Sequence, residues 1–224
     1  METQANIKLP KVIFLDAVGT LFGVRGSVGT VYGEVAEKFG VKVAPDTLDS
    51  AFYQTFKSAP PLVFPGMNQD EVPKYEFEWW QEVALRTFHK VGVLHEFLDF
   101  SVFFEELFAH FATDKPWIVY PDVLPALRTW KRAGIELGII SNFDSRIHAV
   151  LSALDLGKFF TSITISAEVG IAKPGAEIFA AGLQKHNCSG ELAWHIGDNL
   201  EEDYQGARAA GLRPILIQRQ SEVS

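Results

Sequence analysis

The feature of this sequence that most constrains its fold is the alternation, from about Pro121 to the C-terminus, of short apolar runs with stretches of helical spacing. The spacing predicts strands over residues 135–140, 162–166, 193–196 and 214–217, separated by helices over 145–154, 177–185 and 202–210. Strands that alternate with helices join through right-handed crossovers into a parallel sheet. Val12–Leu15, an earlier run that is apolar throughout, is typical of a strand buried on both faces. The sequence therefore predicts an α/β protein with a doubly wound, Rossmann-like parallel sheet.

Residues between Phe22 and about Pro116 follow a different pattern, with helical spacing and little that predicts strand. Apolar side chains mark three helical faces, formed by Val28, Val31, Tyr32, Val35 and Phe39, by Phe77, Trp80, Ala84, Phe88 and Val91, and by Phe97, Phe100, Phe104, Leu107, Phe108 and Phe111. The proline-rich stretch 59–66 predicts a loop. We therefore expect a core of residues 1–22 and 117–224, with an all-helical cap, residues 23–116, inserted after the first strand.

Polar residues follow the predicted strands where each strand ends. Asp16 comes directly after the first strand, Ser141 and Asn142 after the second, and Asp198 after the strand at 193–196. Lys173 lies in the loop that follows the strand at 162–166. Because ligands of open α/β sheets bind outside the carboxyl ends of the strands, these side chains are expected to meet in one crevice.

The order and spacing of these residues resemble the four motifs of the haloacid dehalogenase superfamily. The matching segments are Asp16-Ala17-Val18-Gly19-Thr20, Ser141-Asn142, Lys173-Pro174, and Gly197-Asp198 with Glu202 and Asp203. The resemblance covers essentially the whole chain, because a helical cap inserted after the first motif is also a trait of the family. Within the family, a helical-cap subgroup shares Val28-Gly29, Tyr32, Ala36, Gly40 and the pair Trp79-Trp80. The resemblance implies a hydrolase that forms a covalent intermediate on Asp16.

The same resemblance implies a magnesium site beside the nucleophile. Asp16, Asp198 and the backbone carbonyl of Val18 would bind Mg²⁺, which prefers hard oxygen ligands. Glu202 and Asp203 would orient the waters around the ion. The resemblance further implies that a small phosphorylated metabolite is the substrate, hydrolysed through an aspartyl-phosphate.

Further side chains are expected to contact the substrate or the nucleophile. The resemblance implies that Lys173 neutralises a phosphoryl oxygen and holds the nucleophile, and that Ser141 binds another oxygen. We also expect Asn142 to bind substrate. Arg25 is a candidate for substrate contact, with Ser27 and Tyr32, because these residues come just after the first linker into the cap.

Val18 departs from the pattern of the family's phosphatases, which usually carry a second Asp two residues after the nucleophile. That Asp protonates the leaving group and later activates water, a contribution of about 10²–10⁴-fold in rate. A slow phosphatase is therefore the first expectation, and a binding or regulatory protein with little turnover is an alternative. A dehalogenase would need a cap arginine, for which Arg25 and Arg86 are available, and a phosphonatase would need a reactive cap lysine such as Lys57.

Composition excludes several classes of partner. The formal net charge of −8 disfavours nucleic acid and anionic membranes. The single cysteine, Cys188, rules out an intramolecular disulfide, and the six histidines lack metal-ligand spacing. No apolar run approaches the ~20 residues of a membrane helix, and no targeting segment stands out. We expect a cytoplasmic monomer or homodimer.

Overall fold

The computed structural model describes residues 9–219 and contains a five-stranded parallel sheet with the strand order β5-β4-β1-β6-β7. The strands are β1 Val12–Leu15, β4 Glu136–Ser141, β5 Ser162–Ile165, β6 Ala193–Gly197 and β7 Arg213–Leu216. β1 lies at the centre, paired with β4 on one side and β6 on the other. The termini of the predicted core, residues 1–8 and 220–224, lie outside the described residues.

Both faces of the sheet are covered, and alternate residues of β1 show how. Ile13 and Leu15 belong to a hydrophobic cluster with helices α5 (Val123–Arg132) and α6 (Ile147–Ala153). Val12 and Phe14 belong to a second cluster with α8 (Ala176–Lys185) and α9 (Gly206–Ala209). A strand buried on two faces needs apolar residues at every position, which explains the unbroken run. This arrangement confirms the predicted doubly wound α/β sheet.

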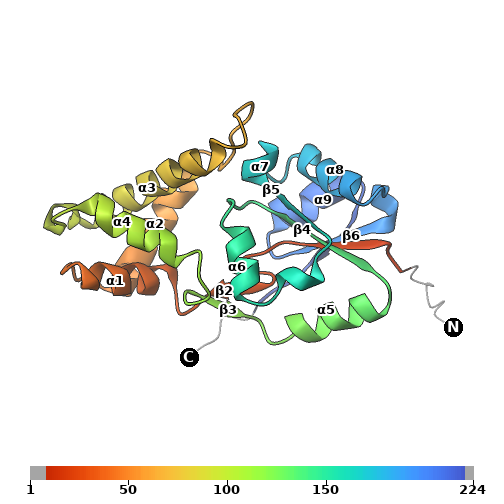
Figure 1. Cartoon of the computed structure of the whole chain (residues 1–224), viewed down its shortest axis with the longest axis horizontal. Coiled ribbons are helices and arrows are strands. Elements are labelled where there is room, and N and C mark those ends of the chain that lie inside the picture. The colour runs from red at the N-terminus through yellow and green to blue at the C-terminus, as the bar shows by residue number, and fades with distance from the viewer. Residues whose placement is uncertain (1–8, 220–224) are drawn as a thin grey trace.

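The segment between β1 and β4 contains four longer helices that pack on one another. They are α1 Val28–Lys38, α2 Pro45–Ser58, α3 Val72–Val91 and α4 Phe100–His110. Their buried side chains form a third hydrophobic cluster, and Figure 1 shows the four helices grouped beside the sheet. The sequence analysis did not identify α2, although its buried Leu48, Ala51, Phe52 and Thr55 follow helical spacing and a proline occupies its first turn.

A two-stranded antiparallel ribbon connects the helical segment to the sheet. β2 (Phe22–Val24) leads into α1, and β3 (Trp117–Val119) leads away from α4. The expected boundaries at 22/23 and 116/117 therefore fall in or beside paired strands, and the division into a core and a cap stays a prediction. Among residues 9–219, no helix has both the length and the apolar character required to cross a bilayer.

One predicted helix has a different form. Instead of a regular α-helix over 202–210, the chain forms a π-helical turn, η4 (Leu200–Gln205), followed by the short α9. Asn199 caps the turn, because its side chain accepts hydrogen bonds from the backbone N–H groups of Glu201 and Glu202. The carboxylate of Asp203 accepts from the Asn199 N–H at 3.0 Å, which folds that side chain back toward the end of β6.

The predicted strands otherwise differ from the observed strands by about one residue at their ends. Two short helices not predicted are η1 (Leu94–Glu96) and α7 (Ser166–Val169), which follow Val93 and β5 respectively. Two more 3₁₀ turns are η2 (Gly157–Phe159) and η3 (Gly190–Leu192).

Candidate active site

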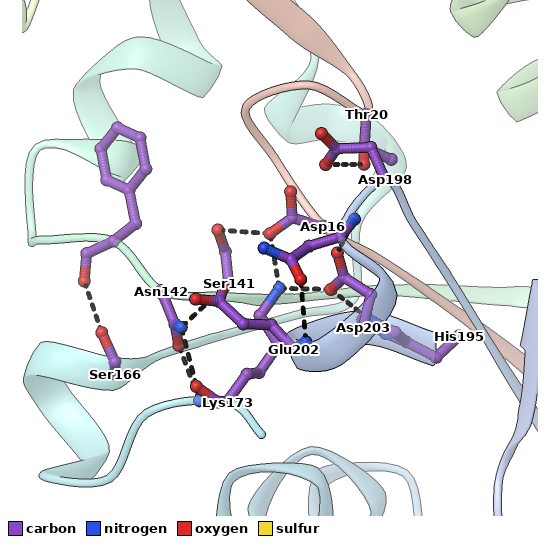
Figure 2. Close-up of polar contacts among 12 residues, drawn as sticks. Asp16, Thr20, Ser141, Asn142, Ser166, Lys173, His195, Asp198, Glu202 and Asp203 are labelled. Carbon is purple, nitrogen blue, oxygen red and sulfur yellow. Dashed lines mark hydrogen bonds and ion pairs between the residues drawn. The ribbon is translucent and has the colours of Figure 1, made fainter. Parts of the chain in front are cut away.

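Asp16 stands at the carboxyl end of β1 and is held by side chains from two other segments. Its Oδ1 accepts a hydrogen bond from Ser141 Oγ at 2.9 Å. The same Oδ1 forms an ion pair with Lys173 Nζ at 2.7 Å (Figure 2). Ser141 ends the neighbouring strand β4, and the backbone N–H of Asp16 is fixed by Ile196 of β6. The three predicted residues therefore meet at one edge of the sheet.

Lys173 lies between two carboxylates in a buried position. Its ammonium contacts Asp203 Oδ1 at 2.6 Å in addition to Asp16, and its side chain is 1% exposed. Burial alone would lower the pKa of Lys173, but the charges of Asp16 and Asp203 outweigh it, so the pKa is raised. The ammonium therefore stays charged, and it provides the fixed cation that an anionic substrate would require in an acidic protein.

Asn142 positions the backbone of the lysine. Its Oδ1 accepts from the Lys173 N–H at 2.7 Å, and its Nδ2 donates to the Lys173 carbonyl at 3.0 Å. The same Nδ2 donates to Glu202 Oε2 at 3.0 Å. The side chain of Asn142 is thus engaged with protein groups, which supports a positioning role and leaves direct substrate binding by that amide without support.

His195 is a site residue that sequence reasoning missed. It lies on β6, fully buried, and its Nε2 is 2.8 Å from Asp203 Oδ1. Burial lowers the pKa of His195, so the ring is neutral and donates from Nε2 to the carboxylate. Asp203 in turn has a pKa held well below its usual range, because its bond to His195 and the charge of Lys173 outweigh its burial. The available signal was a histidine inside an otherwise buried strand, two residues before Gly197.

Three carboxylates form a group that fits a divalent cation. Oxygen atoms of Asp16, Asp198 and Asp203 lie within 4.8 Å of one another. Burial, followed by the charges of Asp16 and Asp203, raises the pKa of Asp198 to about 6. The neighbouring carboxylates thus place negative charge around Asp198, and hard oxygen donors are those that Mg²⁺ selects. The donor set therefore fits Mg²⁺. Asp203, whose oxygens already contact Lys173, His195 and a backbone N–H, is better placed to orient the site than to bind the ion.

Glycine is required beside this group. Gly19 has a φ of +84°, and a Cβ there would lie 2.4 Å from Asp198 Oδ2. At Gly197 a Cβ would lie 2.1 Å from Asp203 Cγ. The two glycines of the motifs therefore let the backbone approach the carboxylates closely.

A cavity of about 260 Å³ opens beside the edge of the sheet that carries Asp16, between the helical segment and the loop after β4. Ten aromatic side chains contribute to its lining, together with Val18 and Asn142 from the site itself. Val18 is 38% exposed at the mouth of this cavity. The cavity therefore begins two residues from Asp16.

The residues expected to contact substrate from the cap are distributed differently. Tyr32 lines the cavity, whereas Ser27 caps α1 by accepting from the Thr30 N–H. Arg25 donates to the carbonyls of Lys115 and Trp117, so it joins the two sides of the ribbon and lies outside the cavity lining. Substrate contact by Arg25 is therefore unsupported by its position.

The side chains required by the two less favoured reactions also lie elsewhere. Arg86 is exposed and pairs with Glu82 on α3. Lys57 is exposed in the last turn of α2 and is outside the cavity lining. Neither residue is therefore placed to serve a dehalogenase or a phosphonatase at this cavity.

A second set of contacts that sequence reasoning missed connects α3 to the loop after β4. Trp80 Nε1 donates to Asp144 Oδ2 at 2.7 Å, and Asp144 also binds the guanidinium of Arg146. Glu76, 1% exposed, accepts from the backbone N–H of Ser145 at 2.9 Å and from its hydroxyl. The signal available in the sequence was the polar run 144–146, which follows the Ser141-Asn142 motif after one intervening residue, Phe143.

Comparison with known proteins identifies the family. A family model described as haloacid dehalogenase-like hydrolase matches residues 10–211. The human haloacid dehalogenase-like hydrolase domain-containing protein 3 is 31% identical over 209 residues, which cover 92% of this chain and 81% of the human protein. The Xenopus laevis protein of that name is 32% identical over 209 residues, covering 92% of this chain and 84% of its own length.

Solved structures share the fold. A HAD phosphatase from Thermococcus onnurineus superposes with a TM-score of 0.63 at 20% identity, over 96% of this chain and 89% of the other. The L-2-haloacid dehalogenase from Xanthobacter autotrophicus gives a TM-score of 0.67 at 17% identity, over 96% and 80%. At such identities the likeness concerns the fold alone, and the two proteins have different activities. The comparisons confirm the family expected from the four motifs.

Proposed function

The chain belongs to the haloacid dehalogenase-like hydrolase family, and from that membership we propose that it is a Mg²⁺-dependent phosphatase of small phosphorylated metabolites. The observation that carries the proposal is the convergence of Asp16, Lys173 and Asp198 at one edge of the sheet. A buried ammonium beside a carboxylate nucleophile suits a dianionic phosphoryl group better than it suits a neutral substrate.

Asp16 is the nucleophile in the first step. A carboxylate oxygen attacks phosphorus, the bond from phosphorus to the leaving oxygen breaks, and its electron pair stays on that oxygen. Lys173 and Ser141, at 2.7 and 2.9 Å from Asp16 Oδ1, hold the carboxylate and would bind the phosphoryl oxygens. In the second step water attacks the phosphorus of the aspartyl-phosphate, the bond to Asp16 breaks, and inorganic phosphate leaves.

Asp16 and Asp198 would hold Mg²⁺, with the carbonyl of Val18 as the expected third protein ligand. When bound, the ion supplies positive charge that offsets the negative charge of the phosphoryl group. Asp203 holds Lys173 from the other side, and Glu202 holds Asn142, so these two carboxylates keep the cationic part of the site in place.

Release of inorganic phosphate from a panel of phosphomonoesters, with Mg²⁺ and with EDTA, tests the proposal. Asp16→Asn keeps the shape of the side chain and removes the nucleophile, so we expect a loss of at least about 10³-fold in kcat. Asp155→Asn changes an exposed carboxylate far from the sheet edge and serves as the matched control.

Equal activity of the wild type and Asp16→Asn would contradict the mechanism, and full activity in EDTA would contradict the role of the metal. A protein that binds phosphate esters at equilibrium but releases no phosphate would instead be a binding protein, the alternative that Val18 favours.

A further inference from the structure

The cavity beside Val18 has a composition that selects one kind of substrate. Its volume of about 260 Å³ exceeds the roughly 150 Å³ of an engineered cavity that accepts benzene, so one or two fused rings fit. Its walls are chiefly aromatic, and Phe56 and Trp80 stack at 5.9 Å between ring centroids. Tyr53 and Phe56 line the cavity while remaining 60% and 45% exposed, so their rings are open to contact with a ligand.

Charge in the cavity is already compensated. Among the described residues, Arg146 is the charged side chain that lines the cavity. Its guanidinium binds both oxygens of Asp144 at 2.8 and 2.7 Å and lies 3.9 Å from the centroid of the Phe108 ring. A second anionic group on the substrate would therefore find no free cation there. The body of the substrate is expected to be flat and uncharged, with its one phosphoryl group at Lys173.

Among the described residues that line the cavity, none has a side chain suited to protonate a leaving group. Val18 has no exchangeable proton, and Asn142 and Arg146 do not act as acids at neutral pH. Burial raises the pKa of Tyr32, and burial with the charge of Asp49 raises that of Tyr53, so neither hydroxyl readily gives up its proton. Within the described lining of the cavity, the leaving oxygen must therefore depart as an anion.

We infer that the substrate class is a phosphate monoester of a phenol or similarly acidic hydroxyl carried on a flat apolar ring system; this inference rests on the proposed function. A phenol ionises with a pKa of about 10, as Tyr does. A phenolate therefore leaves without protonation far more readily than an alkoxide does. The Asp16 carboxylate attacks phosphorus, the bond from phosphorus to the aryl oxygen breaks, and the electron pair leaves with the phenolate. The phenolate takes a proton from solvent, and water then hydrolyses the aspartyl-phosphate.

Four phosphate compounds test separately the two parts of the inference, which are the acidic leaving group and the flat apolar ring system. The probes are 2-naphthyl phosphate, 2-(2-naphthyl)ethyl phosphate, acetyl phosphate and glycerol 3-phosphate. The first two share a ring system but differ in the acidity of the leaving group, and acetyl phosphate has an acidic leaving group without a ring. We expect kcat/KM for 2-naphthyl phosphate to exceed that for the naphthylethyl ester by about 10²-fold or more, because no acid assists the alkoxide. We expect the KM for 2-naphthyl phosphate to be about tenfold lower than that for acetyl phosphate, because its rings are buried in the cavity.

Two sets of variants assign these preferences to residues. Val18→Asp supplies an acid, so we expect it to raise kcat/KM for the naphthylethyl ester by about 10²-fold. The ratio of kcat/KM for 2-naphthyl phosphate to that for the naphthylethyl ester should therefore fall. The double variant Tyr53→Ala, Phe56→Ala is expected to lower the ratio of kcat/KM for 2-naphthyl phosphate to that for acetyl phosphate by about tenfold. Val102→Ala removes an exposed apolar side chain of the same helical segment outside the cavity and should preserve the ratio.

The outcomes distinguish this inference from the proposed function. If all four compounds are hydrolysed with Mg²⁺ at similar kcat/KM, and Asp16→Asn abolishes the reaction, the phosphatase stands and the inference fails. If none of the four compounds is hydrolysed, the proposed phosphatase activity and the inferred substrate class are both contradicted. Quenching of tryptophan fluorescence by 2-naphthyl phosphate in Asp16→Asn supplies an equilibrium readout, and quenching equal to that by glycerol 3-phosphate would overturn the assignment of the cavity.

Discussion

At the scale of single residues, Gly19 brings the loop that follows Asp16 close to the carboxylate of Asp198. It has both a left-handed backbone conformation and a close approach to Asp198, whose Oδ2 would lie 2.4 Å from an added Cβ. Gly19 therefore limits where the carboxylate of Asp198 can lie.

Gly19→Ala is expected to weaken Mg²⁺ binding by about tenfold or more. The left-handed conformation costs about 1–2 kcal/mol for alanine, and the Cβ would displace the carboxylate of Asp198. Gly40→Ala is the matched control, because Gly40 has a similar φ of +82° with no atom within 4 Å of an added Cβ. Isothermal titration with Mg²⁺ and thermal unfolding of both variants make the comparison; equal Mg²⁺ affinity in the two would contradict the steric argument.

The sequence allowed the main polar residues of the site to be placed together, but not their connections. Asp16, Ser141, Lys173 and Asp198 follow strands whose ends share an edge, so their proximity follows from topology alone. The contact of His195 with Asp203 depends on which face of β6 the ring occupies, and a short strand that is apolar at most positions does not show this in its sequence pattern. The roles assigned to these residues remain predictions.

At the scale of elements, helix α3 is fastened to the loop that follows β4. Trp80 and Glu76 lie one turn apart on α3 and reach Asp144 and Ser145. The loop that begins at Asn142, directly after Ser141, is thus in contact with the helical segment. A change in the position of α3 would be transmitted to the residues that hold Asp16 and Lys173.

Trp80→Phe is expected to lower the free energy of unfolding by about 1.5–3 kcal/mol, because it removes a donor from the buried carboxylate of Asp144 while keeping an aromatic ring. Trp79→Phe is the neighbouring control, since its indole donates at 3.0 Å to the exposed carbonyl of Pro60. Urea unfolding of both variants gives the difference. A larger effect from Trp79→Phe would show that the contact with Asp144 does not stabilise the fold.

Element prediction succeeded where the pattern is set by burial and failed where it is set by local hydrogen bonds. The strands of the sheet are covered on both faces, so their apolar runs identify them. The π-helical turn η4 forms because Asn199 and Asp203 bond to nearby backbone N–H groups, and helical periodicity contains no information on such a turn. The ribbon strands β2 and β3, of three residues each, are too short to show an alternation.

At the scale of the whole molecule, Mg²⁺ binding is expected to stabilise the fold by mass action. At a concentration one hundred times its Kd, a ligand of the native state adds about 2.7 kcal/mol, which raises the Tm of a chain of this size by roughly 5–10 °C. Because the pKa of Asp198 is raised to about 6, the carboxylate is ionised above that pH and protonated below it. The Mg²⁺-dependent rise in Tm should therefore be full at pH 7.5 and decline as the pH falls through 6.

Without Mg²⁺ the contribution of Asp198 has the opposite sign. A carboxyl whose folded pKa is raised favours the native state at low pH, and this contribution is lost as the pH rises through about 6. Differential scanning calorimetry at pH 5.0, 6.0 and 7.5, with Mg²⁺ and with EDTA, measures both trends. Asp198→Asn should remove the Mg²⁺-dependent shift, and a shift of equal size at all three pH values would contradict the assignment.

The antiparallel pairing of β2 with β3 makes the whole helical segment, topologically, the loop of a hairpin. Its entry and exit points are neighbouring strands, about 4.8 Å apart, clasped by Arg25. Closing a loop costs free energy that grows only slowly with length, so the hairpin tolerates a long insertion or a short one. Another helical segment could therefore be grafted onto the same two strands. Such an exchange would change which molecules reach the carboxylates without moving the sheet.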